Sequence, residues 1–122
     1  MKTLFYVLAF SLTAAISGAH ELDQHARVVV SPAPAYPAPG PYEPEEGIVS
    51  VLIEVDAKGD AKVVRVMCSS SYRFAEAARV AVTKWKFSAA KREGNPSRDS
   101  LEFVMIFSPT KEVEIVGPLY EI

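Results

Sequence analysis

The sequence of 122 residues is poor in the side chains on which enzymes and disulfide-linked domains depend, since it contains one cysteine and two histidines. A single cysteine, Cys68, cannot form a disulfide within the chain, so the fold must rest on its hydrophobic core. Cys68 lies in an apolar run, and we expect it to be buried. No histidine lies near it in sequence to act as a base, so the pattern predicts no nucleophilic thiol and no enzyme.

The sequence also has no large excess of basic over acidic residues, or of acidic over basic ones. The 13 basic and 15 acidic residues give a net charge of −2, which offers no basis for nucleic-acid binding. No motif for a small-molecule substrate is present. Both histidines lie at the start of the mature chain, in a flexible terminus. Such a terminus would not hold in place a metal site made from His20, Glu21, Asp23 and His25. We therefore expect no metal ion and no cofactor.

The longest uncharged apolar run lies at the N-terminus. Lys2 precedes the run from Leu4 to Ile16, and the small residues Ser17-Gly18-Ala19 follow it. This order is typical of a secretory signal peptide over residues 1–19, cleaved after Ala19. The alternative is an uncleaved anchor, but the run is shorter than the roughly 20 residues that span a bilayer. The sequence therefore predicts a secreted mature chain.

Proline is concentrated in one place. Residues 20–45 form a short charged segment followed by a stretch, 31–44, that holds six of the nine prolines. Proline fixes φ and donates no hydrogen bond, so this stretch is predicted to be extended. We interpret it as a stiff spacer. The alternative is a ligand for an aromatic groove on a partner, with Tyr36 and Tyr42 as contacts.

Alternating apolar residues predict a β-hairpin and a later strand. Residues 48–56 and 61–68 flank a turn that contains Gly59, and the second strand is expected to bury Val64, Val66 and Cys68. A third strand covers residues 101–107. Residues 112–116 alternate well enough for a fourth strand from the tail. The opposite face of this sheet is either a partner surface or shielded by other segments. It is also partly apolar, with the side chains of Ile48, Leu52, Val63, Met67, Val104 and Ile106.

A helix is predicted over residues 74–87, with one of the preceding serines, 69–71, as its N-cap. Its apolar residues recur at helical spacing, at Phe74, Ala77, Ala78, Ala81, Val82 and Trp85. Residues 88–100 have the composition of a polar loop. The predicted fold class is α+β, with a three-stranded antiparallel sheet, one helix packed on one face in the order β-β-α-β, and a fourth strand from the tail.

Residues 36–107 resemble the C-terminal domain of TonB, the energy transducer of Gram-negative outer-membrane transport. The motifs that carry the resemblance keep its order and spacing: Tyr36-Pro37, Glu46-Gly47-Ile48-Val49-Ser50-Val51, Val55-Asp56-Ala57-Lys58-Gly59-Asp60, Val66 with Ser69-Ser70, Ala77-Ala78, Trp85-Lys86-Phe87, and Gly94 with Pro96. The chain departs from the family in lacking prolines at Ser88-Ala89-Ala90. It also has a short proline stretch behind a cleavable leader, where an anchored transducer has a membrane helix and a long arm.

The resemblance implies a periplasmic protein with a binding domain at 46–110 and a tail at 111–122. Its implied partner is an outer-membrane TonB-dependent receptor or another periplasmic protein, which adds a strand beside the last strand of the sheet. The partner-binding residues implied are Ser100, Leu101, Glu102, Phe103, Val104, Met105, Ile106 and Phe107, together with Tyr36 and Pro37. One alternative is that the tail, 112–116, covers this edge as permanent structure or as an autoinhibitory plug. Another is an assembly protein that homodimerises through the same edge.

Overall fold

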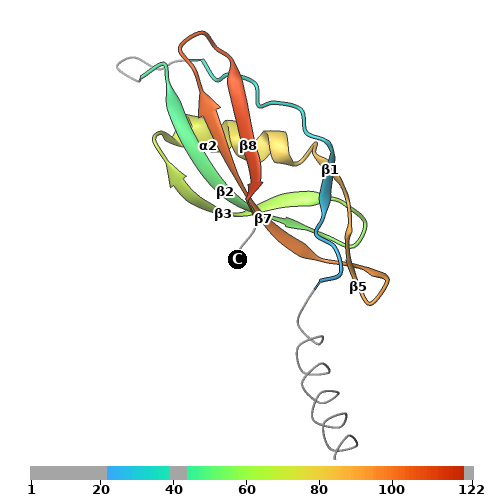
Figure 1. Ribbon diagram of the computed structural model, residues 1–122. Coiled ribbons are helices and arrows are strands. Elements are labelled where there is room, and N and C mark those ends of the chain that lie inside the picture. Colours follow the sequence, from blue (N-terminus) through green and yellow to red (C-terminus); the bar gives the residue numbers. More distant parts are fainter. Residues whose placement is uncertain (1–21, 39–43, 120–122) are drawn as a thin grey trace, which may run out of the picture.

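The computed structural model describes residues 22–38 and 44–119, and the predicted signal peptide lies outside them. The fold is α+β, as predicted. A four-stranded antiparallel sheet with the strand order β3-β2-β7-β8 carries the helix α2 on one face (Figure 1). The elements are β1 Arg27–Val30, β2 Gly47–Val55, β3 Ala61–Ser69, α2 Tyr72–Val82, β4 Lys86–Ser88, β5 Ala90–Arg92, β6 Asn95–Ser97, β7 Asp99–Phe107 and β8 Val113–Leu119.

The two central strands, β2 and β7, form the regular part of the sheet. Each has nine residues, and they pair without a break from Gly47 opposite Phe107 to Val55 opposite Asp99. Both alternate between buried and more exposed positions, as a strand with one core face should. The core between this sheet and α2 is built from the side chains of Val49, Val51, Ile53, Val55, Phe74, Ala78, Val82, Trp85, Leu101, Phe103, Met105 and Phe107.

The strand β3 departs from the predicted alternation. Its register against β2 shifts between Cys68 and Val66 and again between Arg65 and Val63. Each shift inserts one residue and reverses which side chains face the core. As a result Val63 packs against the core while Val64 and Cys68 are exposed. The predictions that Val64 and Cys68 are buried, and that Val63 lies on the opposite face, are therefore wrong.

The helix α2 ends earlier than its periodicity predicts. It spans Tyr72–Val82, and Thr83 is its C-cap. After Lys84 and Trp85, residues Lys86–Ser88 form β4, which pairs with β1. The predicted helix end at Phe87 is therefore wrong. A sequence pattern cannot reveal the long-range backbone pairing that residues 86–88 adopt instead. Ser71 occupies the N-cap position, but its side chain makes no capping hydrogen bond.

Trp85 lies beyond the helix but remains in the core, as predicted. Its side chain is fully buried, edge-on to the Phe103 ring at 4.9 Å between centroids. The predicted polar loop that follows contains a small hairpin, β5 and β6, joined at Glu93 and Gly94, both with positive φ. The interruption of the helix thus leaves the tryptophan in place and changes only the backbone around it.

The segment 22–38, interpreted above as including a spacer, packs along the domain. The side chain of Ala26 is fully buried, and the indole Nε1 of Trp85 donates a hydrogen bond of 2.9 Å to the carbonyl of Pro32. In Figure 1 this segment runs along the side of the domain from β1 towards the start of β2. In the part of the chain that the structure describes, no helix is long and apolar enough to cross a membrane.

Candidate protein-binding site

The predicted binding strand, 100–107, lies within β7 and is paired on both sides. β2 covers one edge and β8 covers the other. Strand addition needs a row of free backbone N–H and C=O groups. The edge of β7 is therefore available to a partner only when β8 leaves it, which corresponds to the alternative in which the tail covers the edge.

The strand β8 is held less firmly than the strand it covers. It pairs with β7 from Val113 opposite Phe107 to Leu119 opposite Glu102, and the register shifts between Glu102 and Val104. No residue of β8 is buried, although Val113 and Ile115 pack partly against the core. In β7, by contrast, five of nine residues are buried. Apolar burial therefore stabilises β7 much more than β8.

A glycine fixes where β8 crosses β7. Gly117 has φ = 139°, and a Cβ atom there would lie 2.7 Å from Cδ1 of Phe103 and 3.0 Å from the carbonyl oxygen of Glu102. A side chain at this position would be strained by the backbone and would collide with β7. The close packing of β8 against β7 thus depends on this glycine.

The free edges of the described sheet are poor sites for an added strand. The edge strand β3 carries two register shifts and exposed charges at Lys62 and Arg65, which protect an edge from pairing. The outer edge of β8 contains Pro118, which has no N–H to donate. The edge of β7 beneath β8 is the long and regular one, since its nine residues pair with β2 in an unbroken register.

The structure brings the two other predicted contact residues close to one end of β7. The ring of Tyr36 lies edge-on to the rings of Phe74 and Phe107, with centroids 5.8 and 6.2 Å away. Its hydroxyl is buried and has no hydrogen-bond partner among the described residues. The carbonyl of Pro37 accepts a hydrogen bond of 3.0 Å from Nη1 of Arg73. Tyr36 therefore connects the N-terminal segment to Phe107 of the predicted binding strand.

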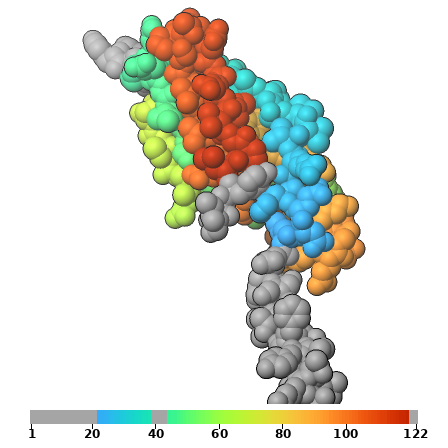
Figure 2. All heavy atoms as spheres, viewed as in Figure 1, coloured from blue at the N-terminus to red at the C-terminus, as the bar shows by residue number. Residues whose placement is uncertain are grey.

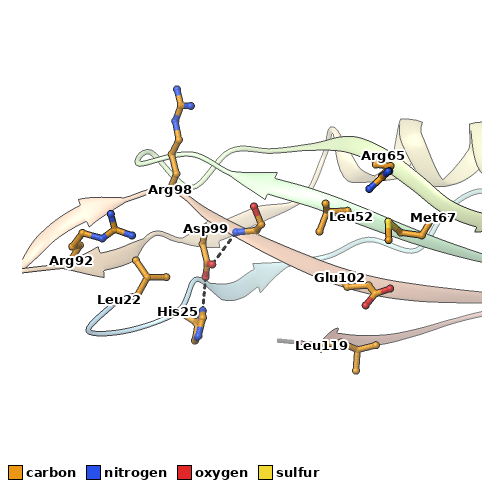
Figure 3. A pocket seen from close by; sticks show the side chains of 11 residues that line it. Leu22, His25, Leu52, Arg65, Met67, Arg92, Arg98, Asp99, Glu102 and Leu119 are labelled. Carbon is orange, nitrogen blue, oxygen red and sulfur yellow. Dashed lines mark hydrogen bonds and ion pairs between the residues drawn. The ribbon is translucent and has the colours of Figure 1, made fainter. Parts of the chain in front are cut away.

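A hollow of about 560 Å³ lies on the open face of the sheet, at the start of β7, and was not predicted from the sequence. Its apolar wall comes from Leu22, Leu52, Met67 and Leu119, and its charged wall includes Arg65, Arg92 and Arg98 (Figure 3). Long-range packing of the N-terminal segment and β5 against the sheet creates it, so no local pattern could have indicated it.

Asp99 is the buried charged residue beside this hollow. Its Oδ2 lies 3.0 Å from Nδ1 of His25 (Figure 3). The same oxygen accepts a hydrogen bond of 2.8 Å from the amide of Ala26, and Oδ1 accepts one of 2.9 Å from the amide of Ser100. The side chain is 6% exposed. Asp99, the first residue of β7, thus joins the N-terminal segment to this strand. The sequence carried a signal for it, because Asp99 continues the inward-facing alternation of the strand.

We expect replacement of Asp99 by alanine to lower the free energy of unfolding by about 1–3 kcal/mol, because a buried acceptor shared by three groups is lost. Urea unfolding followed by tryptophan fluorescence measures this. Asp60→Ala is the matched control, since it removes an exposed ion pair with Lys86 that contributes at most about 1 kcal/mol. Equal losses for the two variants would contradict the role assigned to Asp99.

The four-stranded sheet, the helix α2 on one face and the covered edge of β7 form a small α+β domain. Comparison with known families identifies it further. The family described as the Gram-negative bacterial TonB protein C-terminal matches residues 32–109, and the chain belongs to this family. The family is a transport-related interaction domain and not an enzyme family. No curated protein matched the sequence. The matched region includes Tyr36, Pro37 and all of β7, and it ends before β8.

Proposed function

We propose that this protein is a periplasmic binding module that captures an extended segment of an outer-membrane receptor as a new strand on β7, in place of β8. The observation that carries this proposal is the contrast between the two strands. The edge of β7 is regular over nine residues, whereas β8 covers it with an interrupted register and no buried residue. A partner strand with a continuous register would gain the backbone hydrogen bonds that β8 gives up.

The residues proposed to bind the partner are those of β7 from Ser100 to Phe107. Their backbone groups would supply the affinity. The side chains of Glu102, Val104 and Ile106 point to the open face and would contact alternate side chains of the incoming strand. Tyr36 and Pro37 lie near the Phe107 end of β7. They would contact the residues of the partner that follow its added strand. No catalytic step is part of this function.

Gly117→Val tests the proposal by weakening β8 and leaving β7 intact. The added side chain would collide with Phe103, so β8 should leave the edge of β7. We expect the variant to recover at least about tenfold more receptor from detergent-solubilised outer membranes than the natural protein does. This factor corresponds to about 1.4 kcal/mol of competition from β8. Hydrogen exchange of the β8 amides verifies that the strand is released.

Gly94→Val is the matched control. Gly94 also has positive φ, 81°, but it lies in the β5–β6 turn, where a Cβ atom would meet no other atom within 4 Å. The substitution should strain the turn without changing recovery. Unchanged recovery by Gly117→Val, despite released β8 amides, would contradict a covering role for β8. Recovery of no outer-membrane protein by any folded form would contradict the receptor as partner.

A further inference from the structure

The strand β8 occupies the edge of β7, and its side chains show what this edge accepts. Val113 and Ile115 are half-buried and pack against the hydrophobic core. Glu114 and Val116, which alternate with them, are exposed. Figure 2 shows β8 (red) at the surface across the front of the domain, with β2 and β3 (green) to its left. The strand therefore turns one apolar side to the core and its other side to solvent.

The residues of β7 on the core side are apolar. Val113 lies opposite Phe107, and Ile115 lies opposite Met105. Both β7 residues are buried while β8 is in place. Side chains directly opposite on one face of a sheet are in contact. Departure of β8 would therefore uncover apolar surface of Phe107 and Met105, and a partner strand that takes its place would have to cover this surface again.

The open-face side of the same edge makes a weaker demand. There Glu114 lies opposite Ile106, and Val116 lies opposite Val104. A charged residue and an apolar residue of β8 are thus both accepted over apolar residues of β7. Ile106 remains 38% exposed in spite of its neighbour. Side chains on this side stay in contact with water, so their replacement changes little apolar burial.

We infer that the partner segment captured on β7 carries aliphatic side chains at two positions separated by one residue, which replace Val113 and Ile115 against the core. The inference rests on the strand capture proposed above and adds the chemistry of the partner. The residues that alternate with the two aliphatic positions can be polar or charged. Polar side chains at both core-side positions would lie against Phe107 and Met105, whose side chains offer them no strong hydrogen-bond partner, and would weaken capture.

Peptide titration of the full-length Gly117→Val protein tests this inference, because β8 is expected to leave the edge of β7 in that variant. The probe is a synthetic peptide with the sequence of residues 111–119, blocked at both ends. It should shift the backbone amide NMR signals of residues 100–107. The natural protein should bind the probe at least about tenfold more weakly, because its own β8 competes at a high effective concentration.

Two double-serine peptides separate the two sides of the strand. The core-side peptide carries Val113→Ser and Ile115→Ser. It should bind at least about tenfold more weakly than the probe, because two aliphatic side chains no longer cover the core. The open-side peptide carries Glu114→Ser and Val116→Ser and is the matched control with the same number of changes. It should bind within about threefold of the probe, as is usual for changes at exposed positions.

The outcomes separate this inference from the proposed function. Equal weakening by the two double-serine peptides, or greater weakening by the open-side peptide, would overturn the inference. A Gly117→Val protein that recovers receptor but does not bind the probe would also overturn it and would leave strand capture standing. Recovery of no receptor, together with the expected order of peptide affinities, would support the side-chain requirement and contradict only the receptor as partner.

Discussion

Trp85→Ala is expected to destabilise the domain by about 3–5 kcal/mol, the range observed for removing a large aromatic side chain from a core. The indole is fully buried, edge-on to Phe103, and 6.3 Å from the ring of Phe87 between centroids. Its N–H also donates to the carbonyl of Pro32. The substitution therefore removes core packing and the hydrogen bond that ties the proline segment to the domain.

This loss is a large share of the 5–15 kcal/mol that stabilises a typical domain. For a domain of this size, each kcal/mol lowers the melting temperature by about 4–8 °C, so a decrease of at least about 12 °C is expected. Differential scanning calorimetry measures it. Trp85→Phe is the control, because it keeps a buried ring and loses mainly the hydrogen bond, and it should cost less than half as much. Equal losses would show that the Pro32 contact, and not packing, dominates.

The order of the main elements could be predicted because each depends on a local pattern. Alternation indicated β2, β7 and the strand in the tail, and the helical spacing from Phe74 to Val82 indicated α2. The family match to residues 32–109 confirmed the resemblance that these elements suggested. These segments bury one face each, and burial of one face leaves a periodic signal in the sequence.

The errors have a common physical cause, which is backbone pairing and packing between different segments of the chain. The exposure of Cys68 follows from register shifts that β3 adopts against β2. The early end of α2 follows from the pairing of β4 with β1, residues more than 50 positions apart. The contact between Tyr36 and Phe107 and the anchoring of His25 by Asp99 also join the two ends of the domain. A pattern within one segment carries no information about such partners.

The position of the strand proposed to bind the partner was predictable, but its covered edge was only one of the alternatives. The sequence indicated a strand at 100–107 and another in the tail. Whether the second pairs with the first depends on the turn between them, where Lys111 adopts a positive φ of 69° and its amide donates to the carbonyl of Ser108. This local geometry folds β8 back onto β7.

The second large effect concerns β8 itself, since a covalent link that holds it on β7 should abolish receptor capture. Ile106 and Glu114 are directly opposite in the β7–β8 register. Cross-strand pairs have Cα separations of about 4.5–5.5 Å, within the range of a disulfide. The double variant Ile106→Cys and Glu114→Cys, made with Cys68→Ser, should therefore form this link when oxidised.

Ser50→Cys is the matched control in the otherwise natural sequence. Ser50 lies opposite Cys68, so a disulfide there links β2 to β3 and leaves the β7–β8 edge untouched. It adds one crosslink to the same sheet, with the same chemistry. Receptor recovery by this variant should be the same before and after oxidation.

The measurement that tests the account most directly is receptor recovery from solubilised outer membranes by the β7–β8 linked protein, oxidised and then reduced. We expect at least about tenfold less receptor in the oxidised form, about 1.4 kcal/mol or more, and full recovery after reduction. Equal recovery by both forms, with the disulfide verified by mass spectrometry, would show that the partner binds without displacing β8 and would contradict strand replacement on β7.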